Sequence, residues 1–220
     1  MQISRLILFM LLPALLMGCH PLTQTVPQNE EIIDQDRPGP TEEKSITTKL
    51  TSLTIENFYF EKPQHTPQLT SLKIFKSIRT LELYGDGVLL GRFKIALGGS
   101  PEGDKKQEGD SKTPEGQYFI CTRNNRSRFT LFLGLSYPNI EDGKRGLENG
   151  LINNETFDII KRSIENDQQP PWNTPLGGAV GIHGKGNSYD WTLGCVALSD
   201  EDITILWDYT PLGTMVEIFP

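Results

Sequence analysis

The 220-residue chain has few of the residues that carry disulfide or metal chemistry, with only three cysteines and three histidines. Three cysteines far apart in the sequence do not make the dense framework of a disulfide-stapled domain. Structural zinc needs four protein ligands and catalytic zinc usually three, whereas residues 70–220 offer only His183, Cys195 and the distant Cys121 as N or S donors. We therefore expect no bound metal and no cofactor.

The chain also lacks positive charge. It has 21 Lys and Arg against 28 Asp and Glu, which gives a formal net charge of −7 at pH 7. Nucleic acids and anionic lipid headgroups would be repelled by such a protein. We therefore expect no nucleic-acid partner.

No apolar run is long enough to predict a membrane-spanning helix. Residues 1–18 carry one cation, Arg5, and a short apolar stretch, which indicates a cleaved export signal. Gly18 followed by Cys19 resembles a bacterial lipobox, in which the cysteine becomes the acylated N-terminus. The alternative is an ordinary secretory signal with an incidental cysteine. Acylation of Cys19 predicts a lipid anchor on the periplasmic side of the cell envelope, and His20 after it favours the outer over the inner membrane.

Residues 19–45 are rich in Pro, Gln, Thr, Glu and Asp, with too few apolar residues to offset the entropy of ordering. We interpret them as a flexible tether. Residues 46–69 are assigned to an N-terminal extension of unsettled structure, in which Leu53, Ile55, Phe58 and Phe60 could pack on the domain.

From residue 70 to 220, apolar and polar residues mostly alternate, which is typical of half-buried strands. Strands are expected over residues 72–75, 80–84, 88–97, 117–123, 129–135 and 213–219. Asp86-Gly87 predicts a hairpin turn. The Gly- and Pro-rich segment 98–116, called the 98–116 loop below, is long enough to be functional or mobile.

Two short helices complete the predicted domain. One covers residues 155–166 with Asn154 as its cap, and the other follows Ser199, with Ile203, Leu206 and Trp207 facing inward. The predicted class is mainly β with a few short helices.

The segment 181–198 carries the strongest sign of chemistry. Its His183 precedes Cys195 by twelve positions, and glycines surround both. A thiol is a strong nucleophile only as the thiolate, which a nearby imidazole helps to form. The segment predicts a nucleophile–base pair at the rim of a sheet. If Cys121 and Cys195 were instead joined in a disulfide, this catalysis would be blocked.

Three motifs, in this order, resemble the YkuD-type L,D-transpeptidase family. They are Gly-Asp-Ser-Lys-Thr-Pro-Glu-Gly-Gln-Tyr at 109–118, Gly-Ile-His-Gly at 181–184 and Gly-Cys-Val-Ala-Leu at 194–198. The segments at 135–139 and 190–192 are similar to a subgroup of the family. The resemblance implies a catalytic domain over residues 70–220, built as a mixed β-sandwich or open barrel.

The resemblance also implies an activity, namely a cysteine acyltransferase that acts on peptidoglycan stem peptides in cell-wall organisation and cell shape. Cys195 would attack the carbonyl of an L-centred residue, expel the terminal D-amino acid and pass the acyl group to an amine. The same pair could instead use water, as an L,D-carboxypeptidase or amidase. A non-catalytic peptidoglycan-binding lipoprotein is the other alternative.

The roles of individual residues follow from the chemistry of the pair. His183 would accept the proton of Cys195, or hold the thiolate as an ion pair, and a backbone carbonyl would orient the imidazole. The backbone N–H groups of Gly194 and Cys195 would bind the oxyanion. Gly184, Tyr189, Trp191 and Thr192 are the candidate substrate contacts.

Two departures from the family motif bear on substrate recognition. Leu193 replaces a polar residue, and Ala197 stands where the family carries an arginine. Lys112, Thr113 and Glu115 are interpreted as part of a solvated loop, with substrate contact as the alternative. Arg123, Arg126 and Arg128 would either meet the acidic stem peptide or form a solvated basic turn.

Overall fold

The computed structural model describes residues 58–220. The predicted leader, the lipidation site Cys19, the tether, Leu53 and Ile55 all lie outside the described residues. Among residues 58–220 no helix has the length and apolar character needed to cross a bilayer.

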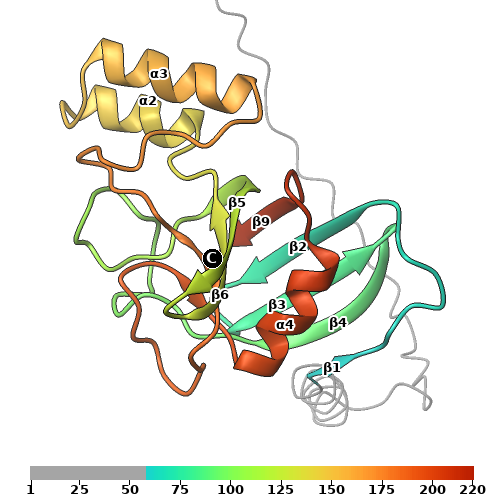
Figure 1. The fold of residues 1–220 in the computed structure, drawn as a ribbon. Helices are drawn as coiled ribbons and strands as arrows, with labels where there is room; N and C mark the ends of the chain where they lie inside the picture. Colours follow the sequence, from blue (N-terminus) through green and yellow to red (C-terminus); the bar gives the residue numbers. More distant parts are fainter. Residues whose placement is uncertain (1–57) are drawn as a thin grey trace, which may run out of the picture. The chain divides into compact units, whose positions relative to one another are not determined.

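The fold is mainly β, as predicted, and consists of one mixed, curled sheet (Figure 1). Its strands are β1 (Tyr59–Phe60), β2 (Thr70–Phe75), β3 (Thr80–Gly85), β4 (Val88–Lys94), β5 (Gly116–Ser127), β6 (Thr130–Leu135), β7 (Gly181–His183), β8 (Val196–Ala197) and β9 (Met215–Phe219). They lie in the order β1-β4-β3-β2-β9-β5-β6-β7-β8. The β2–β9 and β7–β8 pairs are parallel and the others antiparallel.

The chain after β4 folds back against β8, the last strand of this order. The strand expected over residues 88–97 ends as β4 at Lys94, and Ala96 then forms an isolated antiparallel bridge with Ala197. Their backbone N–H and C=O groups exchange hydrogen bonds of 2.9 and 2.8 Å. This contact curls the sheet into an open barrel and ties the neighbourhood of Cys195 to the β4 side.

The main core lies between the curled sheet and α4 (Asp200–Tyr209), which crosses one face of the sheet in Figure 1. The Ser199 side chain caps α4 by accepting a hydrogen bond from the Asp202 backbone N–H at 3.0 Å, as the sequence predicts. Ile203 and Leu206 are fully buried, and Trp207 packs against the same core.

A helical pair, α2 (Ile140–Glu148) and α3 (Asn154–Glu165), lies at one end of the domain around a second, small core (Figure 1). The cap of α3 is Asn153, one residue before the predicted Asn154. Helix α2 was not predicted, because its two glycines disfavour a helix. Both glycines serve packing: a Cβ on Gly146 would lie 2.6 Å from Leu176 Cδ2, and one on Gly143 3.1 Å from Phe157.

The 98–116 loop is fixed to the domain by buried charges, which corrects its interpretation as a solvated loop. Thr113 is 0% exposed, and the buried Lys76 ammonium, just after β2, donates to the carbonyls of Gly103 (2.7 Å) and Thr113 (2.9 Å). The same ammonium forms an ion pair with Glu115 at 2.7 Å. Satisfied hydrogen bonds make burial of this cation tolerable, so the loop has one preferred position.

Replacing Lys76 with methionine tests this anchoring. The change leaves Glu115 and two carbonyls without their cation. We expect the free energy of unfolding to fall by about 2–3 kcal/mol. This loss is smaller than the loss on breaking a fully buried ion pair, because Glu115 is partly exposed. Urea unfolding measures the loss. The matched Lys73→Met removes a lysine of β2 whose ammonium lies over the Tyr84 ring, and it should cost less than about 1 kcal/mol. Equal losses in the two variants would contradict the anchoring role.

Candidate active site

His183 ends β7, and Cys195 directly precedes β8, the strand that pairs with β7 in parallel. Ile182 pairs with Val196 and His183 with Ala197, and the side chains of Ile182 and Val196 are buried in the main core. Side chains alternate between faces along a strand, so His183 points away from that core. Cys195 directly precedes β8, and extending the same register and alternation by one residue would set it opposite Gly181 with its side chain on the His183 side.

The imidazole of His183 is held in one orientation. Its Nδ1 lies 2.7 Å from the backbone carbonyl oxygen of Gly184, which is the kind of orienting group that the sequence predicts. Because a carbonyl only accepts, Nδ1 carries the proton and Nε2 is left with a lone pair. Phe129 stacks on the ring at 4.4 Å between centroids, and Trp191 meets it edge-on at 5.6 Å.

Burial sets the charge state of His183. The residue is 1% exposed. Burial lowers the pKa of the imidazole, and the hydrogen bond to Gly184 offsets only part of this effect. At neutral pH the ring is therefore a neutral base, with Nε2 able to accept a proton.

The Cys195 thiol is a free thiol with a raised pKa. Burial raises the pKa of Cys195 to about 11, while a hydrogen bond from the Gly181 backbone and the charge of Lys105 act in the opposite direction. Sγ donates to the carbonyl of Ala179 at 3.7 Å. Within residues 58–220 no hydrogen bond joins Sγ to His183, and no disulfide joins Cys195 to Cys121. At rest the Cys195 thiol and the His183 imidazole are therefore both neutral.

Two buried threonines fix the turn that carries Cys195. The Thr192 hydroxyl donates to the Cys195 carbonyl at 2.7 Å and accepts from the Gly194 N–H at 3.1 Å. The Thr113 hydroxyl, from the 98–116 loop, lies 3.5 Å from the same carbonyl and accepts from the Gly98 N–H at 3.0 Å. Gly194 has φ +134°, and a Cβ there would lie 2.6 Å from the Lys112 carbonyl oxygen. Only glycine fits this conformation.

The same hydrogen bonds bear on the two expected oxyanion donors. The Gly194 N–H is engaged by Thr192, whereas the Cys195 N–H has no acceptor among residues 58–220. The Cys195 N–H is the better placed of the two in this state, and Gly194 could contribute only by leaving Thr192.

Replacing Thr192 with valine keeps the shape of the side chain and removes both of its hydrogen bonds. The buried Gly194 N–H then loses its acceptor, which we expect to lower the free energy of unfolding by about 1–3 kcal/mol. Urea unfolding of the variant gives this loss. Thr204→Val removes an exposed hydroxyl from α4 and should stay within about 0.5 kcal/mol of the wild type. A Thr192 variant as stable as the Thr204 variant would mean that the turn does not depend on this hydroxyl.

The other predicted contacts divide into two groups. Trp191 and Gly184 lie against His183, and the Trp191 indole N–H donates to the Gly186 carbonyl at 3.1 Å. A Cβ on Gly184 would lie 2.3 Å from Asp200 Oδ1, which explains the glycine there. Tyr189, in contrast, is 71% exposed.

Sequence reasoning missed several groups at this site. Phe129, Ala179 and Lys105 carry no local signal, because each reaches Cys195 or His183 only through the folding of a distant segment. Thr113 belongs to a quoted motif, and that motif was the available signal for its role. Among residues 58–220, no three His, Cys, Asp or Glu side chains gather in a way that could hold a metal ion.

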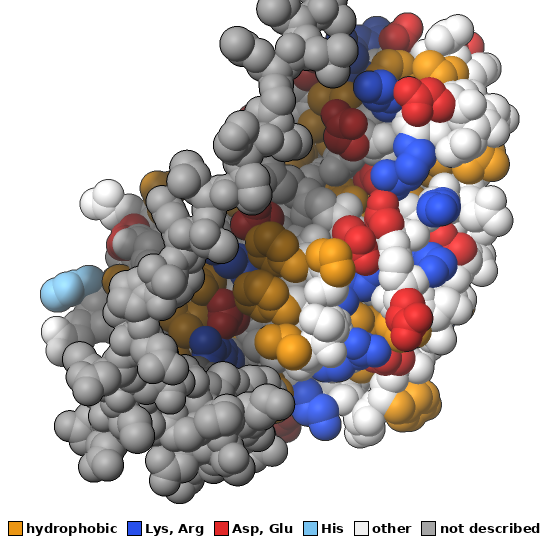
Figure 2. All heavy atoms as spheres, turned by 180° about the vertical axis from the view of Figure 1, so that it is seen from behind, with side chains coloured by type: hydrophobic (Ala, Val, Ile, Leu, Met, Phe, Trp, Pro, Cys, Tyr) orange, Lys and Arg blue, Asp and Glu red, His pale blue; other side chains and the backbone are white. Residues whose placement is uncertain are grey.

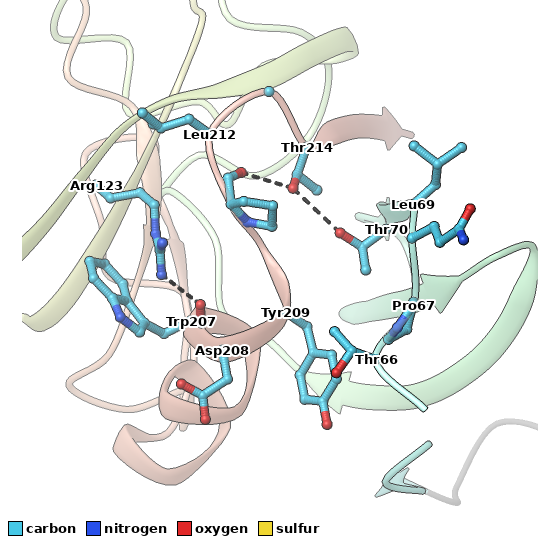
Figure 3. A pocket seen from close by; sticks show the side chains of 13 residues that line it. Thr66, Pro67, Leu69, Thr70, Arg123, Trp207, Asp208, Tyr209, Leu212 and Thr214 are labelled. Atoms are coloured by element: carbon cyan, nitrogen blue, oxygen red, sulfur yellow. Dashed lines mark hydrogen bonds between the residues drawn. The ribbon is translucent and has the colours of Figure 1, made fainter. Parts of the chain in front are cut away.

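A separate cavity of about 550 Å³ lies at the C-terminal end of α4 (Figure 3). Its lining includes Arg123 but neither Cys195 nor His183. The Arg123 guanidinium stacks over the Trp207 indole at 3.9 Å and donates to the Trp207 carbonyl at 2.6 Å. Arg123 is thus committed to the end of α4.

Three solved structures illustrate the resemblance of the chain to known folds. An L,D-transpeptidase from Xylanimonas cellulosilytica is 15% identical, with 82% of this chain and 70% of that chain covered and a TM-score of 0.41. The L,D-transpeptidase of Stackebrandtia nassauensis is 15% identical, with 77% and 64% covered and a TM-score of 0.42. The helical cell shape determining protein Pgp2 from Campylobacter jejuni is 19% identical, with 77% and 54% covered and a TM-score of 0.46.

The chain therefore spans 70% of the first of these structures and smaller parts of the other two. A search of curated proteins found no match. The sequence profile of the YkuD L,D-transpeptidase catalytic domain matches residues 70–218, which is more than half of the chain and includes both Cys195 and His183. The chain belongs to the YkuD family of L,D-transpeptidase catalytic domains.

Proposed function

We propose that this protein is a peptidoglycan-modifying cysteine acyltransferase. Cys195 forms a thioester with the L-centred residue of a stem tetrapeptide and releases the terminal D-amino acid. The acyl group then passes to an amine, either of a second stem peptide or of a wall-linked lipoprotein. The protein would thereby act in cell-wall organisation and cell shape.

One observation carries this proposal, namely the parallel pairing of β7, which ends in His183, with β8, which Cys195 directly precedes. The Gly184 carbonyl holds the proton on Nδ1 and leaves Nε2 as a base. Both groups are neutral at rest, so the thiol becomes a nucleophile as its proton moves to Nε2. For this transfer Sγ would turn from the Ala179 carbonyl toward the imidazole, since catalytic hydrogen bonds often tighten only when substrate binds.

The steps follow from these roles. Sγ bonds to the substrate carbonyl carbon while Nε2 takes its proton, and the carbonyl oxygen becomes an oxyanion near the Cys195 N–H. The C–N bond then breaks, and the imidazolium gives its proton to the departing amine. In the second half an acceptor amine attacks the thioester, Nε2 takes the amine proton, and the sulfur leaves and is reprotonated.

The proposed partner is the peptidoglycan stem peptide. On the face seen in Figure 2, Lys and Arg side chains are interspersed with Asp and Glu. We also propose that a lipid on Cys19 holds the protein at the periplasmic side of the envelope, at the outer membrane where the host has two membranes.

The anchor can be tested apart from the catalytic activity. The full chain expressed in a bacterial host should incorporate labelled palmitate, and Cys19→Ala should not. Labelling that persists in the Cys19 variant would contradict the anchor and leave the catalytic proposal untouched.

Incubation with a disaccharide-tetrapeptide tests the transferase. With an acceptor stem present, we expect free D-amino acid and a cross-linked dimer. A tripeptide as the only product would indicate the hydrolase instead. Binding to peptidoglycan without any product would indicate a non-catalytic binding protein.

A further inference from the structure

A buried lysine of the 98–116 loop lies beside the turn that carries Cys195. The Lys105 side chain is only 3% exposed. Its ammonium forms an ion pair with Asp110 at 2.7 Å, donates to the Gln107 carbonyl at 2.9 Å and lies 5.9 Å from the Tyr137 ring centroid. Lysine is almost never this buried without a partner, and neither His183 nor the steps above use it.

The ammonium lies against the residue that precedes Cys195. A Cβ on Gly194 would lie 3.9 Å from Lys105 Nζ. An ammonium has three donors, and only two of them have acceptors among residues 58–220. The third donor is therefore not committed to a protein group on the loop, and the positive end of the Lys105–Asp110 pair adjoins the turn.

Among the described cations, Lys105 is the one whose charge acts on the Cys195 thiol. Arg145 of α2 lies at the Lys105 backbone, where its guanidinium donates to the Lys105 carbonyl at 3.1 Å, and it pairs with Asp104 and Asp142. Lys112 is turned to the Glu102 carbonyl. The segment from Leu193 to Ser199 contains no Lys or Arg. His183 is neutral at rest and adds no positive charge.

We propose that Lys105 stabilises the negative charge that forms on Cys195, and that the Asp110 carboxylate positions its ammonium for this role. This inference rests on the proposed function, in which Cys195 is the nucleophile. Lys105 acts through space on the sulfur and needs no contact with the substrate. The 98–116 loop thereby contributes electrostatically to the site as well as supporting its backbone through Thr113.

The test is the rate of Cys195 alkylation by iodoacetamide in the full chain, followed between pH 6 and 10 by mass spectrometry of the Cys195 peptide. The main variant is Lys105→Met with Asp110→Asn, which removes both charges of the pair. The amide keeps one oxygen for the backbone N–H groups of Lys106, Gln107 and Lys112, which the two carboxylate oxygens accept from in the wild type. Loss of the lysine charge should raise the pKa of Cys195 by about one unit, the low end of the effect of a nearby opposite charge. The thiolate fraction, and with it the rate of alkylation at pH 8, then falls about tenfold. Because the pKa of the Cys195 thiol is already about 11, the deficit should stay close to tenfold over this whole pH range.

Controls separate this effect from damage to the fold. Lys106→Met removes the exposed neighbouring lysine and should leave the rate unchanged. Cys121, whose pKa burial raises to about 12, should stay slow to alkylate in every folded variant. If the double variant does not fold, the single variant Lys105→Gln takes its place in the alkylation test. Its amide can still donate to Asp110, and the same slowing of alkylation is expected. A folded Lys105 variant that alkylates at the wild-type rate over the whole pH range would overturn the proposal.

Failure of this inference can be told from failure of the proposed function. Alkylation needs no stem peptide, so the comparison stands even if no peptide is turned over. A wild type that cross-links stem peptides, together with Lys105 variants of unchanged alkylation profile, would remove only the role of Lys105.

Discussion

Cys195→Ala is expected to abolish acyl transfer, with kcat/KM falling by at least about 10⁴-fold, since removal of a nucleophile elsewhere costs on the order of 10⁶ in kcat. The alanine removes the sulfur that is proposed to attack the substrate. It leaves the turn intact, because the hydrogen bonds from Thr192 and Thr113 go to the backbone carbonyl of residue 195. Release of the D-amino acid from a tetrapeptide measures the loss.

Cys121→Ala is the matched control for this variant. Its Sγ donates to the Gly134 carbonyl at 3.4 Å, and burial raises its pKa to about 12. It should keep at least about half of the wild-type rate, because a small buried hydrophobe serves packing only. Residual transfer by the Cys195 variant above about one hundredth of the wild-type rate would mean that another group attacks the substrate.

His183→Gln carries the second large effect, an expected fall of about 10²–10⁴-fold in kcat/KM. Glutamine has no titratable base to replace Nε2, so the proton of the thiol goes to water. Unlike alanine, it can still donate to the Gly184 carbonyl, and loss of activity then reports on the base more than on packing. Far-UV circular dichroism and urea unfolding serve as controls for the fold. Activity within about threefold of the wild type would contradict the role of His183.

The pH dependence of the wild type provides an independent check. His183 must be neutral to accept a proton, and burial lowers its pKa from the usual value. The rate therefore rises with pH through the lowered pKa, and the acid limb of kcat/KM should lie below pH ~6.5, the pKa of free imidazole. Initial rates measured at a series of pH values give the acid limb of kcat/KM. This limb should be absent in His183→Gln. A limb above pH 7 would indicate a resting ion pair instead.

The sheet and α4 could be predicted because their signals are local. Alternating apolar residues mark β2, β3 and β6, and Ser199 marks the start of α4. Helix α2 could not be predicted, since its glycines are explained only by contacts with Leu176 and with α3. The closure of the barrel was equally hidden, because the Ala96–Ala197 bridge joins residues about a hundred positions apart.

The candidate site residues could be predicted from the sequence, but the contacts that hold them in place could not. Cys195 and His183 were found because their glycine-rich segments carry recognisable motifs, and the carbonyl partner of His183 followed from the glycine after it. The anchoring of the 98–116 loop was missed, since composition alone cannot tell a solvated Lys from one that a distant carboxylate buries. The commitment of the Gly194 N–H to Thr192 depends on the turn geometry and was likewise hidden.

Intact-mass spectrometry of the full chain, quenched shortly after mixing with a stem tetrapeptide and no acceptor, tests the transfer of the acyl group to sulfur most directly. The predicted result is a mass increase equal to the tetrapeptide minus its terminal D-amino acid, located on the Cys195 peptide, lost on treatment with hydroxylamine and absent in Cys195→Ala. Release of the D-amino acid with no adduct on Cys195 at any quench time, or an adduct on another residue, would contradict it.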